Sequence, residues 1–475
     1  MGYQAGESRT QAALFPVMLE EAVDADAVVR VIDAWVVSLP LGELGFERAV
    51  PAATGRPPYA PADLLKLYLY GYLSGVRSSR RLERECRRNV EVMWLLGRLA
   101  PDHKTIAEFR RTQATALVAA AVAFVQFARR HRLVAGDAVA IDGTKVRAVA
   151  SRKAVVGSRE LPQQAEALRQ RITQYRAGLD RADQEEAGHA LAPEAVRASL
   201  QALRQRHAQV QAQAQRLRES GAATCVSSEP QARVMKHLNS APGYNVQAAV
   251  DTSSHLIVHH EVVDAGNDSR QLAPMAQAAA QVLQRPELHV LADGGYSNGE
   301  HLQRLHEAGI TAWVPPARAV NNRGDGTLYD RSRFTYEAAS DTWRCPAGEL
   351  LKRRNVAWAE AMAHYAPKKG VCTACPQKPR CTNADRRWVS RSLYEEALQA
   401  AQRRINARPE AMRLRRQTVE HPFGTIKEQI LGNARLLLRG MRGARAEMRM
   451  AVLAYNLKRA VNMKGAAWMH QALAG

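Results

Sequence analysis

Three polar residues near the end of the chain have types and spacing suited to binding a metal ion and phosphate together. Arg416 and Glu420 are four residues apart, and Glu420 and Lys427 are seven apart. At about 3.6 residues per turn, these positions line up on one helical face. Pro422 and Gly424 permit a kink after Glu420. A carboxylate flanked by cations suits a site that holds a metal and grips phosphate oxygens.

Two further acids stand far upstream, each at the end of an apolar, strand-like run. Asp142 follows Ala138–Ile141, and Asp293 follows His289–Ala292. A single aspartate at a strand end is more often a turn residue, and Asp251 is the nearest competitor because it also ends a strand. Two strand-end aspartates and one helical glutamate nevertheless favour phosphoryl transfer with two divalent ions about 3.5–4 Å apart.

These three motifs, in this order, resemble the DDE transposases of bacterial insertion sequences. Arg416, Glu420 and Lys427 match the YREK signature of one large group, Tyr-x2-Arg-x3-Glu-x6-Lys, although Arg413 stands at the tyrosine position. The Asp293-Gly294-Gly295-Tyr296 stretch is similar to the Asp-x-Gly-Tyr around the second catalytic aspartate, and Asp142 to the first. The resemblance runs from about Gly55 to about Arg459.

The resemblance implies an α/β (α+β) fold with an RNase H-like mixed-sheet catalytic core. It also implies an enzyme that binds the inverted-repeat ends of an insertion sequence, cleaves phosphodiester bonds and joins the 3′-hydroxyl ends to target DNA. Asp142, Asp293 and Glu420 are then the ligands of two Mg²⁺ (or Mn²⁺) ions, and Arg416 and Lys427 hold phosphates. At least a homodimer on double-stranded DNA is expected.

Two other functions fit parts of this pattern. A catalytically inactive or domesticated transposase would act only as a DNA-binding protein, and a cleavage assay separates it from the enzyme. A different metal-dependent phosphohydrolase with an RNase H-like or phosphatase-like core would not bind DNA ends.

The net charge of +21 over 475 residues makes nucleic acid the first partner to consider. The segment from Arg77 to Arg88 carries six arginines against two glutamates and follows a short turn after an apolar helix. This pattern favours a helix-turn-helix-like DNA reader. The alternative is a solvated basic helix with internal ion pairs such as Glu83 with Arg87. The predicted DNA-binding residues are Arg77, Arg80, Arg81, Arg84, Arg87 and Arg88.

Four domains are predicted to position these residues. Residues 1–135 read as an all-helical N-terminal domain, and 136–315 with 405–475 as the catalytic core. Residues 155–225 show apolar positions at heptad-like spacing with a break in the middle. They indicate a helical-hairpin insertion that packs either on itself or as one face of a dimer. Residues 316–404 form a Cys-rich insertion.

The Cys-rich insertion contains Cys345, a long spacer, and then Cys372, Cys375 and Cys381. Four thiolates favour tetrahedral Zn²⁺ over an iron–sulfur cluster, and reduced structural thiols are the alternative. Clustered cysteines indicate a reducing compartment, and no run of 18 apolar residues predicts a membrane span. We therefore expect no membrane partner and a bacterial cytoplasmic, nucleoid-associated protein.

Overall fold

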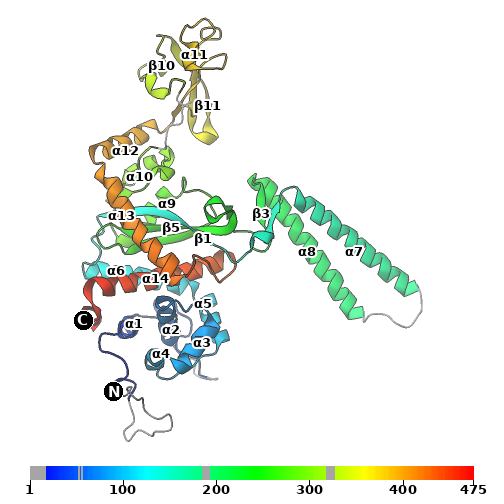
Figure 1. Cartoon of the computed structure of the whole chain (residues 1–475), viewed down its shortest axis with the longest axis vertical. Helices are drawn as coiled ribbons and strands as arrows, with labels where there is room; N and C mark the ends of the chain where they lie inside the picture. Colours follow the sequence, from blue (N-terminus) through cyan, green and yellow to red (C-terminus); the bar gives the residue numbers. More distant parts are fainter. Residues whose placement is uncertain (1–17, 52–53, 55–56, 185–192, 317–326, 475) are drawn as a thin grey trace, which may run out of the picture. The chain divides into compact units, whose positions relative to one another are not determined.

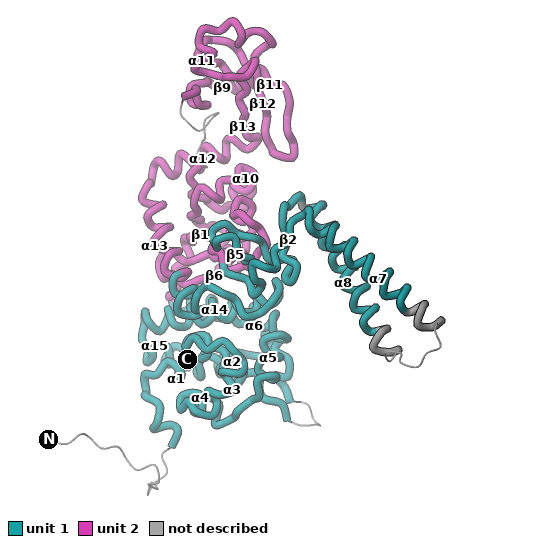
Figure 2. The backbone as a smooth tube through the Cα atoms, turned by 45° about the vertical axis from the view of Figure 1, so that its right-hand side comes forward, with its two compact units in different colours: residues 1–131, 146–243, 424–475 teal, residues 132–145, 244–423 magenta. Residues whose placement is uncertain are grey.

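The computed structural model describes residues 18–51, 54, 57–184, 193–316 and 327–474. They form two compact units, each assembled from separate segments of the chain (Figure 2). The first unit comprises residues 1–131, 146–243 and 424–475, and the second comprises 132–145 and 244–423. These units divide the chain differently from the predicted domains, because residues 424–475 group with the N-terminal helices.

A mixed β-sheet positions the predicted acids. Its strands pair in the order β4-β5-β1-β7-β8, and β6 pairs with β5. β5 and β6 are antiparallel, whereas β1 with β7 and β7 with β8 are parallel. The order β6-β5-β1-β7-β8 is that of an RNase H-like sheet, so the predicted fold class is confirmed. The strands are β1 (Ala138–Arg147), β4 (Arg233–Met235), β5 (Ala241–Asp251), β6 (Ile257–Val263), β7 (His289–Leu291) and β8 (Thr311–Trp313).

Helices of the second unit cover this sheet because they carry apolar stripes. In α9 (Leu272–Leu283) the buried residues include Leu272, Met275 and Leu283, which recur at helical spacing, and the helix packs on β6. Helices α10 (Gly299–Glu307) and α12 (Glu395–Ala407) both pack on β8. Helix α13 (Glu410–Gly424) follows α12 and carries Glu420, the predicted catalytic glutamate (Figure 1).

The predicted Cys-rich insertion contains a second, antiparallel sheet with its own core; residues 317–326 lie outside the described part. Its strands pair in the order β13-β12-β11-β10-β9. The core residues are Phe334, Trp343, Leu351, Ala363, Tyr365 and Val389. The strands are β9 (Thr335–Glu337), β10 (Thr342–Arg344), β11 (Leu350–Ala357), β12 (Met362–Ala366) and β13 (Val389–Ser392), and the short helix α11 spans Lys378–Cys381.

The N-terminal region is helical, as predicted, in its described residues. Its helices are α1 (Val28–Val37), α2 (Pro61–Leu73), α3 (Ser79–Arg88), α4 (Val90–Leu95), α5 (His103–Thr112) and α6 (Ala114–Arg130). They share their core with the C-terminal helices: α14 (Gly440–Lys464) packs on α2 and α6, and α15 (Ala466–Ala474) packs on α1. None of the described helices has by itself the length and apolar composition of a membrane span, and only α5 with α6, bent by 73°, meet that test as a pair.

The other predicted insertion, residues 155–225, is a helical hairpin. Helix α7 (Glu160–Gln184) packs on α8 (Pro193–Ser220), and their bases are tied by β2 (Val155–Gly157) and β3 (Thr224–Val226). Leu161, Val210 and Leu217 are buried between them, with Ala165 and Leu168 packed alongside. Residues 185–192 lie outside the described part. Within the described residues, α7 and α8 pack on each other. A role of this hairpin as one face of a dimer stays a prediction.

Candidate active site

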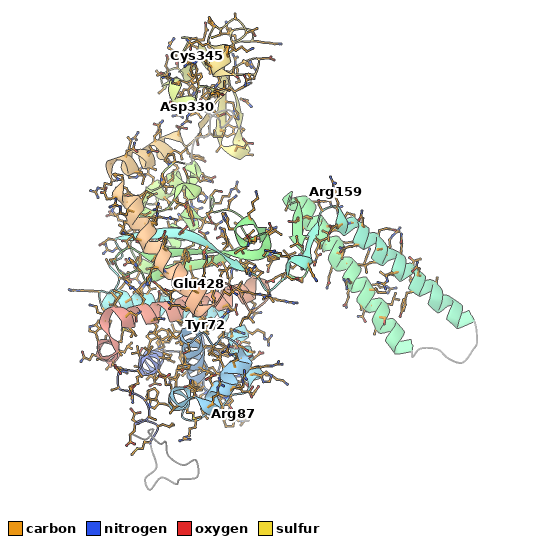
Figure 3. The ribbon with its side chains drawn as sticks, viewed as in Figure 1. Tyr72, Arg87, Arg159, Asp330, Cys345 and Glu428 are labelled. Atoms are coloured by element: carbon orange, nitrogen blue, oxygen red, sulfur yellow. The ribbon has the colours of Figure 1, made fainter. Side chains whose placement is uncertain are left out.

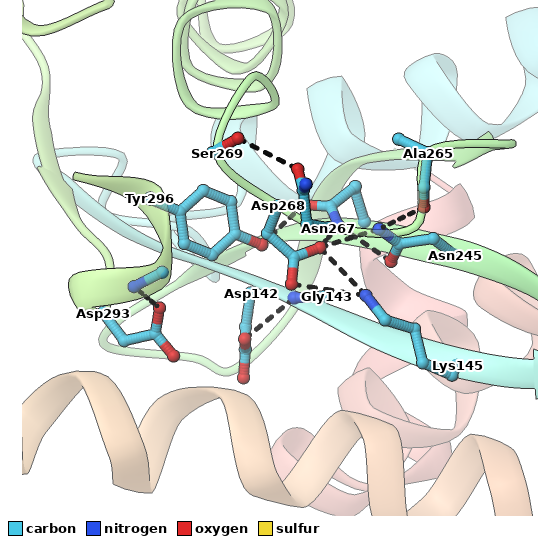
Figure 4. A network of polar contacts seen from close by, with 12 residues as sticks. Asp142, Gly143, Lys145, Asn245, Ala265, Asn267, Asp268, Ser269, Asp293 and Tyr296 are labelled. Carbon is cyan, nitrogen blue, oxygen red and sulfur yellow. Dashed lines mark hydrogen bonds and ion pairs between the residues drawn. The ribbon is translucent and has the colours of Figure 1, made fainter. Parts of the chain in front are cut away.

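The parallel pairing of β1 with β7 sets two of the predicted acids side by side. Ala140 is the register partner of Leu291. Asp142 and Asp293 each follow that pair by two residues, so they lie level with each other, and the two-residue period of a strand gives them the same face. Figure 4 shows both carboxylates on the same side, facing the helix below them. The sequence prediction that these two acids meet is therefore matched by the geometry.

Arg415 lies between these two carboxylates. Its Nη2 atom is 2.8 Å from Oδ1 of Asp142 and 3.4 Å from Oδ2 of Asp293. The Arg415 side chain is only 13% exposed, and its buried Nε has no hydrogen-bond partner among the described atoms. One guanidinium from α13 therefore contacts both acids. Arg415 was not among the site residues predicted from the sequence.

Burial and neighbouring charges perturb the first acid. Burial raises the pKa of the Asp142 carboxyl to about 6, while Arg415 and the Gly143 N–H oppose this shift, and the negative charges of Asp293 and Asp268 add to it. Asp293 is about half exposed, and its Oδ1 accepts a hydrogen bond of 2.8 Å from the Gly295 N–H. The two acids thus sit in different environments although they share one cation.

A second carboxylate network supports the site from behind. Asp268 accepts hydrogen bonds from Lys145 Nζ at 3.0 Å and from the amides of Asn245 and Gln247, both at 2.7 Å (Figure 4). The Tyr296 hydroxyl donates to Gln247 Oε1 at 2.5 Å, and burial raises the pKa of this tyrosine. Three side chains, including the Lys145 ammonium, therefore donate hydrogen bonds to Asp268. These contacts give Asp268 a supporting role beside the two acids.

Gly143 allows this network to pack against β1. A Cβ atom there would lie 2.3 Å from Gln247 Nε2 and 2.7 Å from Asp268 Oδ1. Contacts this short would displace the network, so there is no room for a side chain at the position that follows Asp142.

Glu420 lies on the same helix as Arg415 but on another side of it. Five residues at 100° each place it about 140° around α13 from Arg415, and it is exposed, as is Arg416. Within the described residues no hydrogen bond or ion pair joins Glu420 to Asp142 or Asp293, and no three His, Cys, Asp or Glu side chains are grouped to hold a metal. The convergence of all three acids stays a prediction.

Lys427 belongs to a different kind of turn from Glu420. The α-helix ends at Gly424, and residues Thr425–Ile430 form a π-helical turn with a wider hydrogen-bond spacing. Pro422 is accommodated inside α13. Because the α-helical period does not extend to Lys427, which lies in the first unit, the alignment argument made from the sequence does not apply to this residue.

Asp251, the competitor for the first acid, caps a turn. Its buried carboxylate accepts hydrogen bonds from the Gly136 N–H and from the N–H and hydroxyl groups of Ser253 and Ser254. These donors account for both carboxylate oxygens. We therefore assign Asp251 to the turn between β5 and β6.

Five of the six arginines of the predicted DNA-binding set are exposed, and all five lie on α3. Arg80, Arg81, Arg84, Arg87 and Arg88 are exposed, and Figure 3 shows Arg87 projecting from α3. Two of them also form internal ion pairs, Arg87 with Glu83 at 3.9 Å and Arg88 with Glu85.

Arg77 is a correction to the predicted DNA-binding set. It is buried, and its guanidinium donates to the carbonyl oxygens of Leu431 and Arg435. It also lies 3.9 Å from the buried Glu447. A guanidinium occupied in this way ties the α2–α3 turn to the C-terminal segment of the same unit and is not available to DNA.

The four cysteines of the Cys-rich insertion line one small cavity. Cys372 and Cys375 are joined by a turn in which the Cys375 N–H donates to the Cys372 carbonyl, and the Arg387 N–H donates to Cys372 Sγ at 3.4 Å. Burial raises the pKa of the Cys381 thiol, Arg387 opposes this, and the other three cysteines add to it. As they stand, no three of these thiols are grouped to hold an ion.

The sheet order and the paired acids at its centre define an RNase H-like protein. Two sequence families match the chain: the family described as Transposase domain (DUF772) at residues 17–112, and the family described as Transposase DDE domain at residues 216–457, about half of the chain. The chain therefore belongs to the DDE transposases of insertion-sequence type. Asp293 and Glu420 lie within the second match, whereas Asp142 precedes it.

A solved structure of the piggyBac transposase synaptic complex with hairpin DNA is also similar to the chain. It has 8% sequence identity and a TM-score of 0.24, over 95% of this chain and 83% of that one. A likeness of this size adds no support. No match was found among curated proteins.

Replacing Asp251 with alanine tests its structural assignment. The change leaves several buried donors without an acceptor, and we expect it to lower the free energy of unfolding by roughly 3 kcal/mol. Urea unfolding followed by circular dichroism measures this. Asp26→Ala is the control, because Asp26 is exposed before α1, and it should change stability by less than about 0.5 kcal/mol. A normally stable Asp251→Ala protein that fails to cleave DNA would instead make Asp251 the catalytic acid.

Proposed function

We propose that this protein is the transposase of a bacterial insertion sequence, active in the cytoplasm on the nucleoid. It binds the inverted-repeat ends of the element, cleaves phosphodiester bonds and joins the freed 3′-hydroxyls to target DNA. The observation that carries the proposal is the pair Asp142 and Asp293, held level by β1 and β7 around one cation.

The acids present fit divalent metal ions, which DDE transposase domains generally use. Asp142 and Asp293 already converge on one positive group, and carboxylate oxygens are the ligands that Mg²⁺ prefers. Glu420, from α13, is proposed as the third ligand. Two bound ions supply an activated water or 3′-hydroxyl and stabilise the leaving oxygen.

The remaining residues of the site have proposed roles that follow from their chemistry. Arg416 is exposed on α13, and its planar fork suits a phosphate of the bound DNA end. Lys427 is proposed as a second phosphate contact. The Asp268 network fixes Gly143 and the strand that carries Asp142, so its proposed role is to keep the first acid in place.

A catalytically inactive transposase that only binds DNA is the second candidate. It is favoured by the exposed position of Glu420 and by the absence of a three-acid group among the described residues. Strand cleavage of a DNA fragment carrying the element's ends, with Mg²⁺ present, distinguishes the two.

Neutralising each acid tests the enzyme. Asp142→Asn, Asp293→Asn and Glu420→Gln each remove one proposed ligand of the metal ions, whose stabilisation of the transition-state charge is worth several kcal/mol. A loss of about 4 kcal/mol corresponds to a cleavage rate roughly a thousandfold lower. We expect cleavage in single-turnover assays to fall by that factor while end binding persists. Glu410→Gln, another exposed carboxylate of α13, is the control. Wild-type cleavage by Glu420→Gln would remove Glu420 from the ligand set.

The exposed face of α3 is proposed to contact the DNA ends. Replacing Arg80, Arg84 and Arg87 with glutamine should weaken end binding and reduce the salt slope by roughly one unit for each phosphate group that is no longer bound. Fluorescence anisotropy at several salt concentrations measures both. Arg169, Arg171 and Arg176, exposed on α7, provide a triple-glutamine control with the same change in charge. Equal effects in both triple variants would mean that α3 contributes only net charge.

The Cys-rich sheet is proposed to bind one zinc ion through Cys345, Cys372, Cys375 and Cys381, with an iron–sulfur cluster as the alternative. The shared cavity and the N–H directed at Cys372 Sγ support this. Such binding couples to folding.

Metal analysis of the purified protein tests this site. We expect about one zinc per chain, lost in the double variant Cys372→Ser, Cys375→Ser together with a lower melting temperature. Cys225→Ser is the control, because Cys225 lies in β3, outside the cluster. Iron and a brown colour would select the cluster, and metal-free protein with normal melting would contradict both.

The active form is proposed to be at least a homodimer on DNA, because joining requires two element ends in one complex.

A further inference from the structure

Arg415 places its guanidinium between Asp142, in the middle of β1, and Asp293, which follows β7. Its Nη2 lies 2.8 Å from Asp142 and 3.4 Å from Asp293. The side chain of Arg415 is 13% exposed, that of Asp142 22% and that of Asp293 49%. Its neighbours on α13 differ, since Arg413 and Arg416 are both exposed. The buried Nε has no partner among the described atoms, so within the described part of the chain this guanidinium is held by the two acids.

A metal ion and this guanidinium compete for the same oxygens. Mg²⁺ binds carboxylate oxygens at about 2.1 Å and tolerates little distortion of its geometry. A guanidinium at hydrogen-bonding distance from the same two carboxylates blocks that approach, and its positive charge repels the ion at short range. Lys145 is directed to Asp268, so a second cation does not take over the pair when Arg415 leaves.

We propose that Arg415 is an internal counter-cation. It offsets part of the negative charge of Asp142 and Asp293 in the metal-free protein and leaves them when a divalent ion binds. The inference rests on the proposed function in one respect, because it takes these two acids as metal ligands. Metal binding is then an exchange of one cation for another, and its affinity is set partly by the ease with which Arg415 moves.

Direct metal binding by the full-length protein without DNA tests this exchange. Mn²⁺ affinity is measured by electron paramagnetic resonance of the free ion, and melting temperature is measured with EDTA and with Mn²⁺. Since an ionic neighbour at this range changes the affinity for a proton by about tenfold or more, Arg415→Met should bind Mn²⁺ about tenfold more tightly. Its melting temperature should fall in EDTA and rise more than that of wild type on adding Mn²⁺.

Two further variants control for charge and for folding. Arg413→Met removes an exposed arginine from the same helix and should leave Mn²⁺ affinity unchanged. Arg415→Lys keeps the charge but loses the planar fork, and its affinity should lie between wild type and Arg415→Met. If Arg415→Met does not fold, an Arg415→Lys affinity equal to or weaker than wild type overturns the proposal.

The double variant Arg415→Met, Asp142→Asn separates this inference from the proposed function. If the tighter binding of Arg415→Met disappears in the double variant, both are supported. If wild type binds Mn²⁺ through Asp142 but Arg415→Met binds no more tightly, only the counter-cation role fails. If Asp142→Asn leaves Mn²⁺ binding unchanged in either background, the metal assignment of the proposed function fails, and this inference fails with it.

Discussion

The parallel pairing of β1 with β7 is the constraint on which the candidate site depends. It places Asp142 and Asp293, which are far apart in the sequence, level on one face of the sheet. Parallel neighbours need a crossover connection, and here the intervening chain contains the helical hairpin, β5, β6 and α9. A slip of one residue in this pairing would turn one acid to the opposite face. The buried apolar residues of both strands, Val139, Ile141 and Val290 among them, oppose such a slip.

Bringing two carboxylates together in a half-buried place requires positive charge nearby. Arg415 provides it directly, and Lys145 provides it for the neighbouring acid Asp268. The amides of Asn245 and Gln247 also donate to Asp268 without adding charge. Burying a carboxylate without such partners is costly. The arrangement therefore lowers the cost of burying these acids, and under the proposed function a divalent ion would meet acids that already have a partner.

The apolar runs before Asp142 and Asp293 correctly predicted β1 and β7, although β1 continues for five residues beyond Asp142. The same pattern occurs before Asp251, which caps a turn, so the run indicates the strand but not the role of its aspartate. The sequence did not predict which side chain of α13 reaches the two acids. Residue spacing gives the angle between two side chains around a helix, but not which side of the helix faces the sheet. That side is set by Thr418, Val419 and Pro422, which are buried. Arg415 precedes them by three, four and seven residues, so the apolar stripe was the signal that could have found it. Arg77 shows the same limit, since basic composition does not distinguish an exposed arginine from one that binds carbonyl oxygens.

The two insertions leave this site intact because each has a core of its own. The hairpin buries Leu161, Val210 and Leu217 between its helices, and the Cys-rich sheet buries Trp343, Leu351 and Tyr365. An insertion that satisfies its own apolar surface adds little strain to the strands it interrupts, because loop closure costs grow only slowly with length. The register of β1 and β7 can therefore persist in a chain with long segments between its acids.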